Sequence, residues 1–188
     1  VAAATVMGSL AGAAPVAATV VGNVWTLPGV TLTEAAHTLA VPADMGGRIE
    51  GMQTPGGTGA VRLAVAVAKQ AGVTAIHMGT PSWPNHAQIL SDVVIDFKPF
   101  THANDDGTAN IDAVLDVIRN AQDGDAVLLH ACCHNPTGIE YSDAQWDQIA
   151  EALSNSPALP ILDSAYQGLG QGLEADAYGV RKVLSSAP

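Results

Sequence analysis

Two kinds of hydrophobic pattern alternate along the chain from about Thr58 onward. Segments with apolar residues three and four positions apart, typical of helices, are interleaved with short continuous apolar runs, typical of buried strands. The pattern predicts helices over 60–71, 111–122, 142–153 and 176–185, and strands over 74–78, 93–97, 127–131 and 159–162. Alternating strands and helices are the signature of βαβ units. The sequence therefore predicts an α/β fold of three layers, with a mostly parallel sheet covered by helices on both faces.

Residues at the ends of these segments support the assignment. Gly72 and Gly124 follow the first two predicted helices, where glycine commonly ends a helix. Ser142 and Gln145 have the S-x-x-Q spacing of a capping box, which opens the third helix. Pro160 suits the start of a strand and argues against a central position in a hydrogen-bonded ladder.

Residues 1–32 form a low-complexity segment of mainly Ala, Val, Gly and Thr, and the first charged residue is Glu34. The segment lacks the basic region of a signal peptide, and Gly8, Gly12 and Pro15 dilute it as a membrane helix. We expect a small-residue helix packed against a neighbour, or an irregular terminus. Residues 33–188 are predicted to form one partial domain, because no strand follows the last predicted helix.

Composition narrows the classes of partner and compartment. The chain has 188 residues, 7 basic against 18 acidic, and a formal net charge of -11, which argues against nucleic acid or an anionic membrane as a partner. Its two cysteines, Cys132 and Cys133, are adjacent and cannot form a disulfide framework, so a reducing, cytoplasmic setting fits best. Any bound anion would have to be held locally by backbone amides.

A glycine-rich string precedes the first predicted helix. Gly56, Gly57 and Gly59 would let the backbone approach an anion at the helix N-terminus, and Thr58 adds a hydroxyl donor. The string is neither a Walker A loop nor a G-x-G-x-x-G motif. A phosphate site and a glycine-rich helix start without a ligand both remain open at this point.

Polar residues follow two of the predicted strands directly. Residues 130–138 (HACCHNPTG) follow an apolar run, and residues 163–168 (DSAYQG) follow the next one. Ligands of open α/β sheets bind beyond the carboxyl ends of the strands, so Asn135, Asp163 and Tyr166 are candidate site residues. Asp163 needs a cation, a strong donor or a proton, or else caps the following turn. Asn135 and Tyr166 could instead be a turn former and a packed aromatic.

Other polar residues near the first string are interpreted structurally. His130 and His134 lie four residues apart, but on a strand and a turn they do not share a face as on a helix, so no metal site is expected. Cys132 and Cys133 are interpreted as buried small residues. The bond between Asn135 and Pro136 is a candidate cis peptide, because a tight turn at a strand end is where such bonds occur.

Together with residues 81–86 (PSWPNH) and 53–60 (QTPGGTGA), these strings resemble the aspartate and aromatic amino acid aminotransferases, which are class I aminotransferases of the pyridoxal-phosphate fold type I. The resemblance is dense from about Gln53 to Arg181 and faint earlier, where residues 27–30 echo the start of the large domain. It implies part of that domain, with pyridoxal 5'-phosphate as cofactor. It also implies amino acid and 2-oxo acid substrates, a cytoplasmic location, and a homodimer in the intact protein.

The resemblance assigns roles to individual residues. Asp163 matches the partner of the cofactor's protonated pyridine nitrogen, and Asn135 and Tyr166 match the donors to its phenolic oxygen. Trp83 matches the aromatic side chain that stacks on the ring, and Trp83 and Asn135 also match substrate contacts. The remaining matches are His86 and His130, which lie behind Asp163, and the phosphate cradle of Gly56, Gly57 and Thr58.

The family's Schiff-base lysine has no counterpart in this chain. It lies on the strand after the helix matched by 176–185, and none of Lys69, Lys98 and Lys182 matches it. The resemblance therefore predicts a fragment of an aminotransferase that is inactive by itself, because transamination needs a lysine to hold the cofactor and move a proton. The alternatives are a non-catalytic module that binds the cofactor without the lysine, and another fold type I enzyme such as a β-lyase.

Overall fold

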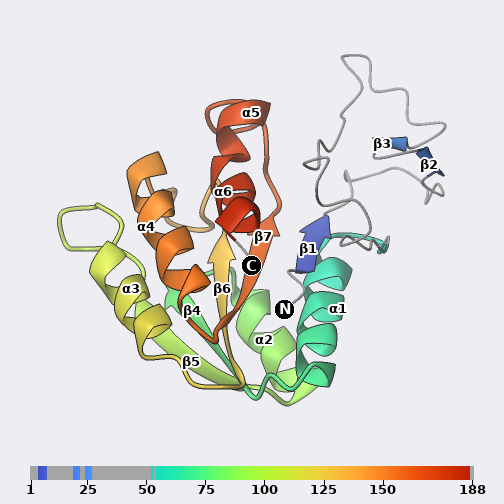
Figure 1. Cartoon of the computed structure of the whole chain (residues 1–188), viewed down its shortest axis with the longest axis horizontal. Helices are drawn as coiled ribbons and strands as arrows, with labels where there is room; N and C mark the ends of the chain where they lie inside the picture. Colours follow the sequence, from blue (N-terminus) through green and yellow to red (C-terminus); the bar gives the residue numbers. More distant parts are fainter. Residues whose placement is uncertain (1–3, 8–18, 22–23, 27–51, 53, 187–188) are drawn as a thin grey trace.

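The computed structural model describes residues 4–7, 19–21, 24–26, 52 and 54–186 (Figure 1). At its centre lies a five-stranded sheet in the order β1-β7-β6-β4-β5, and every neighbouring pair is parallel. The strands are β1 (Ala4–Met7), β4 (Ala75–Thr80), β5 (Asp96–Thr101), β6 (Asp125–His130) and β7 (Leu159–Ser164). A separate antiparallel pair is formed by β2 (Thr19–Val21) and β3 (Val24–Thr26).

Helices cover both faces of the sheet, as predicted. They are α1 (Gly57–Gln70), α2 (Pro84–Val93), α3 (Ile111–Arg119), α4 (Asp143–Ser154), α5 (Leu173–Asp176) and α6 (Tyr178–Ser186). One buried cluster joins α1 and α2 to the sheet through residues such as Ala126 and Leu128. The other joins α3, α4 and α6 to it through Val127 and Leu129. Successive residues of β6 thus enter opposite cores, as the two-residue period of a strand requires.

The central position of β6 explains its sequence. Asp125 to Leu129 are all buried, because both faces of this strand are covered by helices and both edges are paired. Pro160 is the second residue of β7, which agrees with a place at the strand start, and it is the register partner of Val127 on β6. The expectation that this proline argues against a central position in the ladder is wrong, because β7 lies between β1 and β6. The described ladder with β1 begins only after the proline, at Ile161.

The boundaries differ from the predictions where polar residues lie inside elements. Helix α2 was missed because its buried side is made by His86, Ile89 and Leu90, and a histidine does not register as an apolar position. The expected strand 93–97 is displaced, since Val93 ends α2 and β5 begins at Asp96. The expected helix 176–185 corresponds to α6, which begins two residues later, and the short helix α5 before it was not predicted. The capping box at Ser142 is confirmed.

Some predictions fall on residues that the structure does not describe. These are the boundary at residue 33, the echo of the family at 27–30, Gln53 in the glycine-rich string, and most of the segment 1–32. The proposed division into 1–32 and 33–188 therefore stays a prediction. Among the described residues, no helix is both long enough and apolar enough to span a bilayer.

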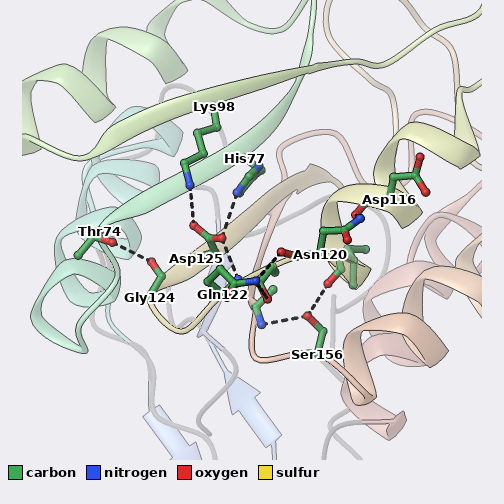
Figure 2. Close-up of polar contacts among 12 residues, drawn as sticks. Thr74, His77, Lys98, Asp116, Asn120, Gln122, Gly124, Asp125 and Ser156 are labelled. Carbon is green, nitrogen blue, oxygen red and sulfur yellow. Dashed lines mark hydrogen bonds and ion pairs between the residues drawn. The ribbon is translucent and has the colours of Figure 1, made fainter.

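A polar cluster ties together the amino ends of the strands (Figure 2). The buried Asp125 carboxylate accepts hydrogen bonds from Lys98 Nζ at 3.1 Å and from the Gln122 backbone N–H at 3.0 Å, and it lies 3.4 Å from His77 Nε2. Burial opposes ionisation of Asp125, but these hydrogen bonds and the neighbouring positive charges hold its pKa below the usual value. The cluster anchors Lys98 at the edge of the sheet opposite to the carboxyl ends.

Helix α6 approaches α4 closely at a glycine. A Cβ added at Gly179 would overlap the Trp146 ring, and both residues are buried. The indole ring therefore occupies the space that any larger residue would need. Tyr178 beside it donates a hydrogen bond to Asp147 on α4 at 2.8 Å, which fixes the same helix pair.

Replacing Gly179 by alanine is expected to destabilise the protein by about 1–3 kcal/mol, the usual cost of overpacking a core. The normal preference of a helix for alanine would act in the opposite direction, by about 1 kcal/mol. Urea unfolding followed by circular dichroism measures the change. Gly57→Ala is the matched control, because a Cβ there meets nothing within 4 Å. Equal stability of the two variants would contradict the packing argument.

Candidate functional site

The two polar strings meet at the carboxyl edge of the sheet. In the parallel pairing of β6 and β7, His130 is the register partner of Asp163. The residues that follow both strands therefore emerge side by side, where open α/β sheets bind ligands. Trp83 is the N-cap of α2 and lies at the same edge, its ring edge-on to His86 with centroids 5.1 Å apart.

A continuous chain of hydrogen bonds runs through these residues. Asp163 Oδ2 lies 2.8 Å from Nε2 of the fully buried His86. Ser82 Oγ lies 3.1 Å from His86 Nδ1 and 3.0 Å from His130 Nε2. The backbone N–H of Asn135 donates to His130 Nδ1 at 3.4 Å. Four of these five residues were predicted to belong to the site.

The backbone N–H of Asn135 is the first donor in this series of hydrogen bonds, and it sets the direction of the others. Burial and the neighbouring His86 lower the pKa of His130 to about 4, so its ring is neutral near pH 7. Because Nδ1 accepts from the Asn135 amide, the proton of His130 lies on Nε2 and is donated to Ser82 Oγ. The Ser82 hydroxyl then donates to His86 Nδ1, and His86 Nε2–H donates to Asp163. Asp163 is thus the terminal acceptor.

Ser82 is the site residue that sequence reasoning missed. It stands inside the string 81–86, which carried the family resemblance, but it was given no role. Its hydroxyl joins the imidazoles of His86 and His130, and His130 is 48 residues away from Ser82 in the sequence. No local pattern reveals such a link, because it depends on the pairing of β4 with β6.

One carboxylate oxygen of Asp163 is hydrogen-bonded to His86, and the other accepts no hydrogen bond from a described residue. Its side chain is 13% exposed, and no described residue donates a hydrogen bond to Oδ1. Beside it, Ser164 Oγ is buried without a partner among the described residues. An ionised carboxylate with an open oxygen at a strand end can bind a cation or a protonated ring nitrogen.

Asn135 and Tyr166 lie in the two turns that leave the strands. The Asn135–Pro136 bond is cis, as predicted, and Thr80–Pro81, for which no such prediction was made, is cis as well. Tyr166 is 40% exposed, and its backbone carbonyl accepts a hydrogen bond from Cys133 Sγ at 3.7 Å. The two turns are therefore linked to each other through the cysteine.

The glycine-rich string begins helix α1, as expected. Gly56 is the N-cap and offers no side-chain hydrogen bond to the amides of the first turn, while Gly57 and Thr58 are exposed. Thr54 Oγ1 donates to the Gly56 carbonyl at 2.9 Å and shapes the start of the helix. An uncapped helix N-terminus is a ready site for an anion. Helix α1 packs beside β1 and β7, and its N-terminus faces their carboxyl ends (Figure 1).

Three further groups extend the site on its buried side. The rings of His102 and His134 stack with centroids 3.6 Å apart, and the ring centroids of His134 and His130 are 4.2 Å apart. Thus His130 and His134 do touch, although they sit on a strand and a turn. With Tyr141 they line a small cavity at the end of β6. Burial lowers the pKa of His102, and burial with the neighbouring imidazoles lowers that of His134 to about 3.

This histidine cluster should make the protein less stable in mild acid. Unfolded histidines take up protons near pH 6.5, whereas His130 and His134 in the folded chain stay neutral down to about pH 4 and about pH 3. Between these values the unfolded state binds more protons, so the free energy of unfolding falls as pH falls. Each group contributes up to about 1.4 kcal/mol per pH unit.

Urea unfolding at intervals from pH 7.5 to pH 4.5 measures this dependence. The variant His134→Asn removes one titrating group and is expected to flatten the profile. The carboxylates of Asp125 and Asp176 each have their own hydrogen-bond partners, and their pKa values are lowered from 3.8. Protonation of these groups would therefore weaken stability only at lower pH. A stability that stays constant between pH 6.5 and pH 4.5 would contradict the prediction.

Comparison with known proteins identifies the family. The family model described as "Aminotransferase class I and II" matches residues 45–188. The chain is 40% identical over 167 residues to a tyrosine aminotransferase of Rhizobium meliloti, which covers 88% of this chain. It is 41% identical over 131 residues to an aspartate aminotransferase of Escherichia coli, which covers 69% of it. The chain belongs to the class I and II aminotransferase family, which confirms the resemblance drawn from its motifs.

A solved relative has the same fold. An aromatic-amino-acid aminotransferase from Burkholderia pseudomallei, described as covalently bound to pyridoxal phosphate, superposes with a TM-score of 0.66 at 33% identity. The match covers 69% of this chain and 33% of that one. The chain spans 40% of the length of the Rhizobium relative and 33% of the Escherichia coli relative.

Proposed function

We propose that this chain is the cofactor-binding part of a pyridoxal-phosphate-dependent aminotransferase. The whole protein would transfer an amino group between aspartate or an aromatic amino acid and a 2-oxo acid, as part of amino acid metabolism and biosynthesis. The observation that carries the proposal is the Asp163 carboxylate, which is anchored by His86 through one oxygen and open at the other. Membership of the aminotransferase family supports the same conclusion.

The residues present fit this cofactor chemically. Pyridoxal phosphate has a protonated ring nitrogen, a phenolic oxygen and a phosphate. When bound, it supplies an electron sink for charge that develops on the amino acid's α-carbon. Asp163 would accept the hydrogen bond of the ring nitrogen and hold its proton there. The uncapped amides at Gly56, Gly57 and Thr58 suit the phosphate, for which the chain's net charge of -11 offers no general attraction.

The hydrogen-bond chain behind Asp163 has a positioning role in this proposal. His86 Nε2–H holds one carboxylate oxygen at 2.8 Å, which fixes the direction of the other. A hydrogen bond donated to a carboxylate favours its ionised form. The series of hydrogen bonds through Ser82 and His130 would therefore help Asp163 to keep a proton on the ring nitrogen. His86 and His130 would not touch the cofactor themselves.

The partly exposed Trp83 and Asn135 and the exposed Tyr166 complete the proposed site at this edge. Trp83, held edge-on by His86, would stack on the cofactor ring and exclude water from one of its faces. Asn135 and Tyr166 would donate hydrogen bonds to the phenolic oxygen. Trp83 and Asn135 would also border the space for the substrate. These roles rest on the matched motifs and on the position of each residue at the carboxyl edge.

Asp163→Ala should abolish most of the activity of the intact aminotransferase. Loss of one preorganised electrostatic partner commonly costs about 10²–10³-fold in rate, so kcat is expected to fall at least that far. A coupled assay with aspartate or an aromatic amino acid and a 2-oxo acid measures it. Asp147→Asn is the matched control, because that aspartate pairs with Lys182 on the helical face. Full activity of Asp163→Ala would refute the proposed role.

We further propose that none of the three lysines of this chain bonds covalently to the cofactor. Lys69 Nζ donates to the Val93 and Val94 carbonyls at 2.6 and 3.1 Å, at the end of α1 remote from Gly57. Lys98 is held by Asp125 at the amino edge, and Lys182 lies 2.9 Å from Asp147. Each amine has a partner outside the residues of the proposed cofactor site. The 188-residue chain should therefore be inactive by itself.

Borohydride trapping tests this second proposal. The chain is incubated with pyridoxal phosphate, reduced with borohydride, digested and analysed by mass spectrometry. No lysine is expected to carry stoichiometric label, and bound cofactor should leave on dialysis without reduction. Asp163→Ala is the control for adventitious surface labelling. A label on one lysine that disappears in Asp163→Ala would show that this chain holds its own cofactor covalently. Binding without any activity in the intact protein would instead favour a non-catalytic module.

The assembly and compartment are also proposals. We propose that the intact protein is a homodimer in the cytoplasm. The family resemblance supports the dimer, and the free cysteines Cys132 and Cys133 are consistent with a reducing compartment.

A further inference from the structure

A group of three metal-ligating side chains lies beside the site and has no part in the proposed reaction. Cys132 and Cys133, at the end of β6, and Asp176, at the end of α5, place one ligand atom each within 4.8 Å of the others. It is the one such group of three among the residues that the structure describes. Cys132 and Asp176 are 4% and 7% exposed, and Cys133 is partly exposed, so the group is buried but reachable.

The spacing suits a single ion. Zinc binds thiolates at about 2.3 Å and carboxylate oxygens at about 2.0–2.2 Å, so tetrahedral ligands lie roughly 3.5–4 Å apart. Cys133 has a left-handed backbone with φ of 50°. The thiols of the two adjacent cysteines lie within 4.8 Å of each other, so the side chains do not point apart. A Cβ added at Gly170 would lie 2.8 Å from Asp176 Oδ1 and 3.2 Å from Cys133 Sγ, so carboxylate and thiol border the same small space.

The Asp176 carboxylate retains capacity for another ligand. Its Oδ2 accepts the N–H groups of Gly168 and Gly170 at 2.8 and 3.0 Å, while Oδ1 accepts only that of Gln171, at 2.7 Å, among the described side-chain contacts. A carboxylate oxygen has two lone pairs, so Oδ1 can bind a cation without loss of the hydrogen bond.

The local field favours a cation at this place. Burial, the neighbouring thiol and the negative charges of Asp176 and Glu140 raise the pKa of Cys132 to about 12. Burial and the charge of Glu140 also raise the pKa of Cys133. The same negative charges that disfavour a bare thiolate attract a positive ion, and a metal removes the obstacle because it neutralises the thiolates it binds.

We propose that Cys132, Cys133 and Asp176 form a binding site for one thiophilic divalent cation of the zinc or cadmium type. Binding breaks two S–H bonds, forms two metal–sulfur bonds and releases two protons, and no oxidation or reduction occurs. The carboxylate supplies the third ligand and water the fourth. The hydrogen bond from Cys133 Sγ to the Tyr166 carbonyl is lost with the thiol proton. The ion would instead join the turn 131–134 to Asp176, whose carboxylate accepts N–H groups of the loop that follows Tyr166.

Cadmium titration of the reduced 188-residue chain tests this site. Cadmium chloride at pH 8 is expected to produce ultraviolet thiolate-to-cadmium charge-transfer absorption that saturates at one ion per chain, and zinc should compete with it. The sequence has only two cysteines, so the signal can come from no other thiols. Cys132→Ser and Cys133→Ser should each weaken binding by at least about 10- to 100-fold, the usual cost of losing even an outer contact of a metal site.

Controls separate the site from other causes. Asp147→Asn, a carboxylate on α4 outside the group, should bind cadmium like the unaltered chain. Circular dichroism verifies that each variant is folded. In Asp176→Asn both thiolates remain, so their charge-transfer absorption reports whether cadmium still binds. Absence of the charge-transfer band, equal affinity in the double variant C132S/C133S, or a species with two chains per ion in sedimentation would each overturn the proposal. None of these outcomes depends on pyridoxal phosphate, so the test is independent of the proposed function.

Discussion

The carboxyl edge of the sheet is organised around one constraint: the Asp163 carboxylate lies mostly out of water and has to be paired. Removing an ionised carboxylate from water costs several kcal/mol unless charges or hydrogen bonds replace the lost solvation. His86 supplies that replacement at 2.8 Å, and it does so from a position with no exposure at all. Helix α2 has to start at Pro84 for His86 to reach Asp163. The imidazole in turn needs Ser82 and His130 to satisfy its second nitrogen.

The two edges of the sheet have different chemistry as a result. At the amino edge, Asp125 is neutralised within the chain by Lys98 and the Gln122 amide, which leaves a purely structural cluster. At the carboxyl edge, His86 and not a lysine holds one oxygen of Asp163, and no described residue donates a hydrogen bond to the other. A protein that satisfied Asp163 with a lysine would have a more stable edge and no place for a positively charged ligand atom.

Much of the fold could be predicted because it depends on local patterns. The alternation of helical and strand periods gave the α/β class, and the glycines, the capping box at Ser142 and Pro160 located several boundaries. The polar residues after β6 and β7 could be recognised as site candidates for the same reason, since only the strand ends need to be known. Ser82 and the stacked pair of His102 and His134 could not be recognised, because Ser82 reaches His130 across 48 residues and His102 stacks on a ring from a distant segment. Helix α2 escaped notice because its most buried residue is polar.

The alternation of β6 residues between two cores also has a consequence for the tolerance of the site to mutation. Val127 and Leu129 belong to one core and Ala126 and Leu128 to the other, so the two cores demand different volumes from neighbouring positions. A shift of the strand by one residue would exchange these sets and would turn His130 to the opposite face, away from Ser82. The geometry of the edge therefore depends on the packing of apolar residues within the sheet. Substitutions among small aliphatic residues deep in the sheet can damage ligand recognition as severely as changes in the pocket itself.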